Sequence, residues 1–333
     1  MTLPSRTTLL VVALVVVAVA APVVLPWLKT PIIMALAYGL AVLGVIVLVR
    51  AGQVSFGHAM FFCFAGYAVA FGHRLWQLDT LSLLPLGAVA GTAFGALIGL
   101  FVVRYRGIFF GMLNLAFSMM LFAVLGKFTG ITNGSDGLRF DRPQVAGAVL
   151  ERDDFESVLL ALSLAAAVGA GMLVMRYFRS VQGQQLAAIK TNETRLEYLG
   201  ISARRVFFGG YLLSAALCGL GGSLSALAQG LVTPESGYWV RSGEFVFIAI
   251  LGGAGHAVGA FVGAFVFEFT KLYLAAFLTG AWQLALGVVL IVIVFAAPSG
   301  LFGLASRWLE KRKRSARPAP LDENRPAAIE GPQ

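Results

Sequence analysis

Charged residues are scarce in this chain of 333 residues: Asp, Glu, Lys and Arg together make up 12%, whereas hydrophobic residues make up 59%. A water-soluble domain carries about 25% charged residues, so the composition excludes a soluble globular enzyme. Cysteine is nearly absent as well. Cys63 and Cys218 both lie in apolar runs, which leaves no disulfide framework or zinc-binding cysteine motif. The mean hydropathy of +0.85 instead predicts a protein that crosses a membrane many times.

Motifs for catalysis and cofactor binding are also missing from the sequence. No G-x-x-x-x-G-K-[ST] phosphate-binding loop is present, because the one Gly-Lys pair, Gly126-Lys127, is followed by Phe128. The three histidines do not have metal-ligand spacing. Ser223 and His256 form a candidate dyad for an intramembrane hydrolase, although small residues at helix contacts explain the same pattern. We therefore expect no enzyme activity, no cofactor and no metal site.

The apolar residues fall into segments of about 20 residues, the length that crosses a bilayer as a helix. These segments are 8–26, 31–49, 52–73, 81–103, 107–126, 157–176, 205–229, 257–275 and 280–297, with a shorter one at 241–253. The pattern predicts an all-α polytopic membrane protein with about ten transmembrane helices, some of them broken. A broken helix persists at membrane depth only where protein or a watery cavity satisfies its backbone, which makes 241–253 a candidate pathway element.

Loop charges predict the orientation of the helices. Residues 177–206 carry five basic and two acidic side chains, and the segment 307–317 is also basic, so both are expected on the cytoplasmic side. The acid-rich segment 127–156 is then periplasmic. Cytoplasmic N and C termini require an even number of crossings, which favours ten.

These patterns divide the chain into three regions. Residues 1–30 hold the first transmembrane helix and its flanks. Residues 31–303 form the main transmembrane domain, with a cytoplasmic loop at 177–204 and a periplasmic loop at 127–156. Residues 304–333 form a basic and then disordered cytoplasmic tail, whose Lys311–Arg314 run predicts contact with anionic membrane lipid and not with nucleic acid.

Several polar side chains interrupt the apolar segments, where they are costly unless they face other helices or a cavity. They are Gln53, Ser55, His58, Asn114, Ser118 and Glu244. We predict that these side chains line a translocation pathway. Helix packing is the alternative for the uncharged residues, and a salt bridge to Arg241 is the alternative for Glu244.

The cytoplasmic segment 184–201 is rich in Ala, Leu and Glu and predicts one or two short helices. Thr191 or Asn192 can cap a helix start, and Gly200 can end a helix. Because its apolar residues are surrounded by water, we expect it to dock in a groove of a partner protein, with a helix lying flat on the bilayer as the alternative. The expected contact residues are Ala187, Ala188, Ile189, Lys190, Glu193, Leu196, Leu199 and Gly200.

Several of these stretches together resemble the LivM-type permease subunits of branched-chain amino acid ABC importers, the LivH/LivM family. The matching stretches are 52–59, 106–107, 133–138, 188–193, 199–201, 251–255 and 298–301. The resemblance runs from about residue 31 to residue 303. One departure is Thr191, which follows Lys190 where the family often has a second charged residue.

The resemblance implies a transport subunit of the bacterial inner membrane that moves branched-chain or related amino acids. Its implied partners are a LivH-like permease subunit, two cytoplasmic ABC ATPase subunits and a periplasmic solute-binding protein, with 184–201 as the loop that couples to the ATPases. Relatives carry urea and other amides, so the solute stays open. A further alternative is an ion-coupled secondary transporter with Glu244 or Glu268 as its coupling site.

Overall fold

The computed structural model describes residue 22 and residues 25–277, 281–296, 300–301 and 303. The predicted first helix at 8–26 lies outside this part of the chain except for positions 22, 25 and 26, and the tail at 304–333 lies wholly outside it. The expected total of ten crossings and the location of the two termini therefore stay predictions.

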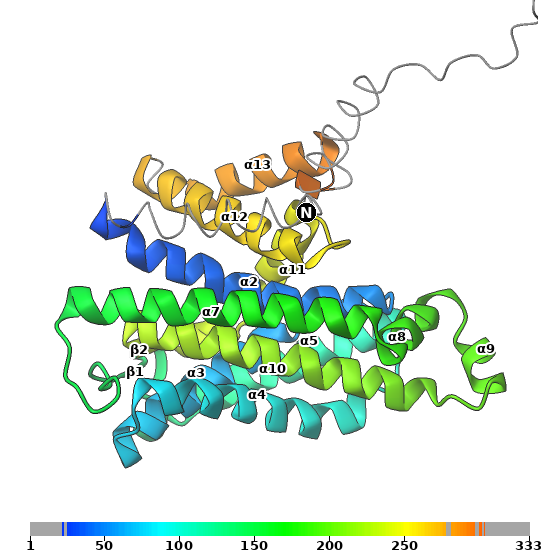
Figure 1. Ribbon diagram of the computed structural model, residues 1–333, viewed down its shortest axis with the longest axis horizontal. Coiled ribbons are helices and arrows are strands. Elements are labelled where there is room, and N and C mark those ends of the chain that lie inside the picture. Colours follow the sequence, from blue (N-terminus) through cyan, green and yellow to red (C-terminus); the bar gives the residue numbers. More distant parts are fainter. Residues whose placement is uncertain (1–21, 23–24, 278–280, 297–299, 302, 304–333) are drawn as a thin grey trace, which may run out of the picture.

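Six long helices run side by side along the long axis of the molecule (Figure 1). They are α2 (Lys29–Arg50), α3 (His58–Trp76), α4 (Thr80–Val102), α5 (Gly107–Lys127), α7 (Arg152–Arg179) and α10 (Ala203–Gln229). A second group lies beside α2 and consists of α11 (Trp239–Gly252), α12 (Ala257–Phe277) and α13 (Trp282–Ala296).

Short elements close the two ends of the bundle. One end carries α8 (Val181–Thr191) and α9 (Glu193–Tyr198). The other end carries an antiparallel pair, β1 (Leu138–Arg139) and β2 (Leu231–Val232), in which Leu138 pairs with Val232 and Arg139 with Leu231. The remaining short helices are η1 (Pro26–Leu28), α6 (Thr129–Thr132), η2 (Gly134–Asp136) and η3 (Pro234–Gly237).

Six helical segments of the described chain are long and apolar enough to cross a membrane: 26–50, 80–102, 107–127, 152–179, 203–229 and 257–277. The chain is therefore a multi-pass, mainly helical membrane protein, as the sequence predicts. The predicted short segment at 241–253 corresponds to α11, which has 14 residues. At about 1.5 Å per residue, a helix of that length is shorter than the roughly 30 Å hydrocarbon core.

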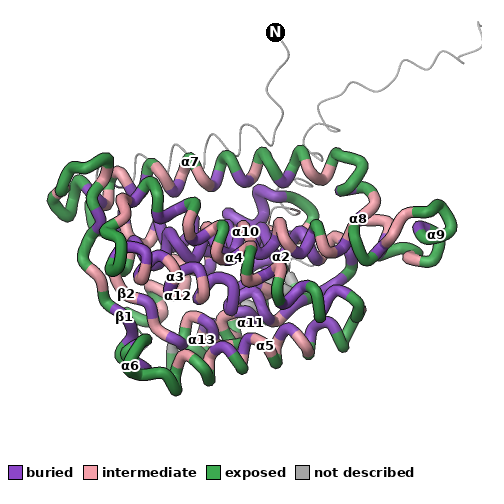
Figure 2. The backbone as a smooth tube through the Cα atoms, turned by 90° about the horizontal axis from the view of Figure 1, so that it is seen from below, coloured by how far each residue is buried: buried purple, intermediate pink, exposed green. Residues whose placement is uncertain are grey.

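Helices α2 and α5 are both strongly apolar, but they differ in how much of their surface is buried within the chain. In their most apolar stretches, 94% of the residues of the η1–α2 segment are buried, against 22% for α5. Figure 2 shows α5 along the edge of the molecule with much of its length exposed. A helix that is apolar all round must be surrounded by protein or lipid, so α5 presents an apolar face to lipid or to another subunit.

Helix α10 packs against three helices through glycines that bring backbones into contact. A Cβ atom on Gly219 would lie 2.7 Å from the carbonyl oxygen of Gly87 in α4. A Cβ on Gly221 would overlap the carbonyl oxygen of Ala37 in α2, and one on Gly222 would overlap that of Phe62 in α3. Small residues permit this approach in membranes. The three glycines therefore fix the distances from α10 to α4, α2 and α3.

We predict that Gly221→Ala destabilises the protein, because its methyl group forces α10 and α2 apart at a cost of about 1–3 kcal/mol. Gly209→Ala on the same helix is the control, since no neighbouring atom lies within 4 Å of a Cβ there and Ala is the better helix former. The apparent melting temperature of the purified protein in detergent should fall for Gly221→Ala alone. Equal melting temperatures for both variants would show that the contact is not limiting.

Candidate functional site

Turns that are distant in sequence meet at the α8–α9 end of the bundle. The Gln53 side chain, only 8% exposed, accepts a hydrogen bond from the Gly107 N–H through Oε1 at 2.6 Å. This bond joins the α2–α3 turn to the first residue of α5. Gly52, in the left-handed region with φ +74°, lies directly against Lys190, whose Cγ would be 2.9 Å from an added Cβ. The α2–α3 turn therefore contacts both α5 and α8.

An ion pair joins α9 to the turn before α5. Arg106 Nε donates to Glu193 Oε2 at 2.9 Å, and Nη2 donates to Oε1 at 2.8 Å. The same guanidinium lies over the Phe207 ring of α10, 4.5 Å from the ring centroid. Two parallel bonds from a guanidinium to a carboxylate restrain orientation as well as distance. The start of α9 is thus fixed to α10 and to the start of α5.

The predicted ends of α9 are confirmed. Asn192 caps its start by accepting a hydrogen bond from the Arg195 N–H at 3.0 Å. Gly200 follows the helix with φ +77°, a conformation that favours glycine. An acidic residue in the first turn, Glu193, also complements the helix dipole.

The expected partner-contact residues divide into inward and outward groups. Ile189 and Leu196 are buried in the chain, whereas Lys190, Leu199 and Gly200 are exposed and Ala187, Ala188 and Glu193 are half-buried. The exposed apolar surface of α9 is formed by Leu199, 70% exposed, and by Tyr198, 87% exposed, which the sequence analysis did not select. Tyr198 lies about 200° around the helix from Leu196, and this spacing could have identified it. We call Tyr198 and Leu199 the exposed pair.

His58 and Ser55, predicted to line a pathway, are buried within the chain. His58 Nδ1 lies 3.2 Å from the Ser55 carbonyl oxygen, and its Nε2 lies 2.8 Å from Ser214 Oγ in α10. Ser214 in turn donates to the Gly44 carbonyl of α2 at 2.8 Å. Ser55 Oγ accepts from the Gly57 N–H at 3.2 Å. In this conformation the network connects α2, α3 and α10.

Asn114 and Ser118 are likewise buried in contacts between elements. Asn114 accepts a hydrogen bond from the Tyr211 hydroxyl of α10 at 2.7 Å and donates to the Phe110 carbonyl at 2.8 Å. Ser118 donates to the Gly237 carbonyl at 2.8 Å, which ties α5 to η3. The helix-packing alternative therefore describes how both side chains are used in this conformation.

Glu244 lies in a different, more accessible place. Its Oε2 accepts a hydrogen bond from Arg241 Nη1 at 2.6 Å, the salt bridge considered from sequence, and the same Nη1 lies 3.2 Å from the Tyr38 hydroxyl. Two cavities, of about 90 Å³ and about 280 Å³, adjoin this group and share Glu235 and Arg241 in their lining. Of the residues predicted to line a pathway, Glu244 lines the larger of these two cavities.

The candidate dyad of Ser223 and His256 is not assembled. Ser223 is buried, donates to the Gly219 carbonyl at 2.8 Å and packs against Gly87 of α4. His256 is exposed in the turn between α11 and α12. Figure 1 shows α4 and α12 on opposite sides of the bundle. This arrangement gives no support to an intramembrane hydrolase.

Comparison with known families shows which class of membrane protein this helical bundle belongs to. Residues 27–296 match the family described as the permease component of branched-chain amino acid transport systems. The chain belongs to this family, and the resemblance noted in its sequence is confirmed.

Individual relatives are similar over most of the chain. The high-affinity branched-chain amino acid transport system permease protein LivM of Escherichia coli is 26% identical over 332 residues, covering 93% of this chain and 78% of that protein, and LivM of Salmonella typhimurium matches equally. The probable permease protein LivH of Methanocaldococcus jannaschii is 22% identical over 206 residues, 60% of this chain and 65% of its own length. No solved structure matches the chain.

We predict that Glu193→Gln loosens α9 without unfolding the bundle. The two side chains of the Arg106–Glu193 pair are 23% and 33% exposed, so losing the charge on one partner should cost about 1 kcal/mol or less. Hydrogen exchange of the amides at 193–200 should then accelerate about two- to fivefold. Arg195→Gln, an exposed side chain on the same helix, should leave that exchange unchanged. Identical exchange in both variants would contradict the role given to the ion pair.

Proposed function

We propose that this chain is a permease subunit of an ABC importer that moves branched-chain or related amino acids inward across the bacterial inner membrane, powered by ATPase subunits on other chains. Family membership over residues 27–296 supports a permease. The observation that carries the proposal is the attachment of α8–α9, with its exposed pair, to the α2–α3 turn and to the start of α5.

The α8–α9 segment has the features of a coupling element. The exposed pair gives an ATPase groove an apolar anchor, as helix-in-groove recognition requires. A displacement of α9 pulls on Arg106, and one of α8 presses on the α2–α3 turn through Lys190 and Gly52. Both turns lead directly into helices that run the length of the bundle. Movement of the ATPases would reach the membrane domain by these contacts.

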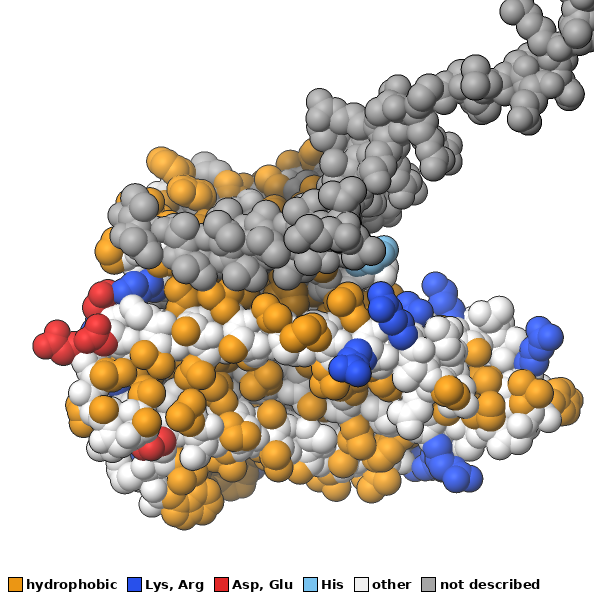
Figure 3. Space-filling model, in the orientation of Figure 1, with side chains coloured by type: hydrophobic (Ala, Val, Ile, Leu, Met, Phe, Trp, Pro, Cys, Tyr) orange, Lys and Arg blue, Asp and Glu red, His pale blue; other side chains and the backbone are white. Residues whose placement is uncertain are grey.

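The charge distribution supports a cytoplasmic location for α8–α9. Figure 3 shows acidic side chains at the β1–β2 end and most of the visible lysines and arginines toward the α8–α9 end. Exposed basic residues at the latter end include Arg176, Arg179, Arg195, Arg204 and Arg205. Basic residues are retained on the cytoplasmic side of bacterial membranes, so the β1–β2 end is the periplasmic side, where a solute-binding protein would dock.

The exposed face of α5 is the proposed contact with a LivH-like permease. Its exposed apolar residues include Ile108, Phe109, Met112, Met120 and Val124. Among the six helical segments of spanning length in the described chain, α5 has the least buried apolar stretch. The larger cavity, lined by Phe122 of α5 and by η3 and α11 residues, lies beside this helix. Pairing at α5 would therefore place the cavity next to the subunit interface.

An ion-coupled mechanism at Glu244 has less support. A coupling carboxylate must be free to exchange a cation, whereas Glu244 is held by Arg241 at 2.6 Å. The second candidate, Glu268, has a buried Oε2 atom without a hydrogen-bond partner among the described residues. Nothing at that carboxylate resembles a multidentate ion site, since the described residues contain no cluster of metal-ligating side chains.

The coupling role predicts that Leu199→Asp abolishes co-purification of the ATPase subunits and ATP-driven uptake. A carboxylate at this position cannot enter an apolar groove without losing its hydration. Val149→Asp is the control for ATPase co-purification, because Val149 is comparably exposed (82% against 70%) in the opposite loop. Both variants should insert normally. Retained ATPase binding by Leu199→Asp would remove the basis for coupling through the exposed pair.

The proposed α5 interface predicts that Met120→Cys forms an oxidative cross-link to a cysteine introduced in the LivH-like partner. Leu97→Cys on α4 has nearly the same exposure, 55% against 53%, and should not cross-link. The native Cys63 and Cys218 are buried, so the parent chain provides the background. Cross-links through position 97 alone would show that the interface lies on α4 and not on α5.

A further inference from the structure

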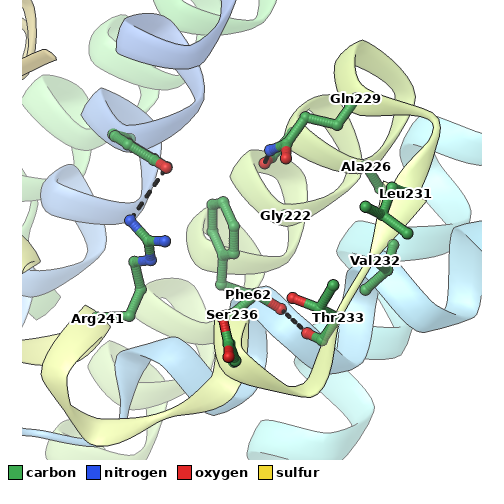
Figure 4. Close-up of a pocket in the computed structure, with 13 residues that line it drawn as sticks. Phe62, Gly222, Ala226, Gln229, Leu231, Val232, Thr233, Ser236 and Arg241 are labelled. Carbon is green, nitrogen blue, oxygen red and sulfur yellow. Dashed lines mark hydrogen bonds between the residues drawn. The ribbon is translucent and has the colours of Figure 1, made fainter. Parts of the chain in front are cut away.

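The smaller cavity lies inside this one chain, near the β1–β2 end. Residues of α2, α3, α10, β2, η3 and α11 line it. Figure 4 shows Arg241 on one side of the cavity and Leu231, Val232 and Thr233 on the other, with Phe62 between them. The larger cavity continues past Arg241 toward Phe122 of α5. Arg241 therefore stands where the two cavities meet.

The guanidinium of Arg241 is only partly used by the protein. Its hydrogen bonds to Glu244 and Tyr38 both come from Nη1. The Nε and Nη2 donors make no hydrogen bond to any side chain or carbonyl that the structure describes, and neither atom is among the fully enclosed unpaired atoms. A guanidinium edge formed by Nε and Nη2 matches a carboxylate with two parallel hydrogen bonds. A free edge beside a cavity is thus a carboxylate-binding group.

The rest of the lining suits the other parts of a small aliphatic amino acid. Phe62, Ala226, Leu231 and Val232 supply apolar wall. Gln229 donates its amide N–H to Ser225 Oγ at 2.9 Å, which leaves its carbonyl oxygen as an acceptor for an ammonium group. Glu235 is exposed, lines both cavities and makes no ion pair with a described residue. The smaller cavity is therefore lined by charged groups of both signs and by an apolar wall.

The Arg241–Glu244 pair is poorly explained as a purely structural bridge. Both residues belong to α11, three positions apart, so their ion pair does not join two helices. It does neutralise the charge of Arg241 when the site is empty, which reduces the cost of an arginine within a membrane domain. Binding of a zwitterionic ligand would leave the net charge of the site unchanged.

We propose that Arg241 binds the carboxylate of a small aliphatic amino acid in the smaller cavity and thereby selects amino acids over uncharged amides. This inference rests on the proposed transport function and deepens it. Glu244 is the internal counter-ion, and Gln229 and Glu235 face the ammonium group. The site belongs to this subunit alone and opens toward the α5 face through the larger cavity.

The test uses the assembled transporter in proteoliposomes, with L-leucine and L-leucinamide as probes. Arg241→Gln should lower leucine uptake at least about tenfold, because charged hydrogen bonds are lost, and should change leucinamide uptake much less. Arg176→Gln, an exposed arginine in the last turn of α7, should change neither. Leucine uptake equal to that of the parent in Arg241→Gln overturns the proposal.

A double exchange separates binding from folding. Arg241→Glu combined with Glu244→Arg retains an ion pair on α11 but moves the guanidinium to a position that lines only the larger cavity. Leucine uptake should stay low in an assembled, ATP-hydrolysing complex. Restoration of uptake by the double exchange would assign Arg241 a structural role and overturn the proposal.

A binding measurement keeps the site testable even if Arg241→Gln fails to assemble or if the chain transports nothing. Thr233→Cys places a thiol in the cavity lining with Arg241 intact, and the buried Cys63 and Cys218 allow the parent chain to serve as background. Leucine should slow alkylation of this thiol, and leucinamide should not. Equal protection by the two probes, or none by leucine, contradicts the carboxylate site. Absence of ATP-driven uptake by the parent assembly contradicts the proposed function instead.

Discussion

Close contact between helix backbones is the constraint on which the rest of this structure depends. Because Gly219, Gly221 and Gly222 occupy successive faces of α10, three neighbouring helices approach it without intervening side chains. Within lipid, apolar burial gives little preference for one helix neighbour over another, so packing at such contacts decides which helices meet. The positions of α2, α3 and α4 around α10 then determine where the polar side chains of those helices can find partners.

The buried polar residues illustrate this dependence. His58, Asn114 and Ser118 sit at helix contacts and are matched there by Ser214, by Tyr211 and by the Gly237 carbonyl. An unmatched polar atom at membrane depth costs several kcal/mol, and each of these bonds depends on the contact between elements at which it lies. Polar residues that the sequence marks as unusual therefore serve here to define the packing, whereas Arg241 lines both cavities.

Sequence periodicity and hydropathy predicted much of the fold, and the reasons for success and failure are physical. Six of the predicted spans, the short element at α11, and the caps at Asn192 and Gly200 depend on local chain properties, which a sequence displays directly. The predicted spans at 52–73 and 280–297 correspond to α3 and α13, which are not among the six helical segments of spanning length and hydropathy in the described chain. Whether a polar side chain faces a cavity or another helix depends on contacts far apart in sequence. For the same reason, hydropathy could not predict that α2 is buried within the chain and that α5 is largely exposed. Arg241 entered the sequence analysis only as a partner for Glu244, because the unused edge of its guanidinium is a property of geometry.

The β1–β2 pairing connects the 127–156 loop to the lining of the smaller cavity. Gly137 lies with its backbone against Val232, which leaves no room for a side chain. The strand pair also holds the 127–156 loop to Leu231 and Val232, which line the smaller cavity. A displacement of the loop at Leu138 and Arg139 would therefore move Leu231 and Val232 as well. If a solute-binding protein docks at this end, as proposed, its contact with the loop would alter the lining of the smaller cavity through the four paired residues of β1 and β2.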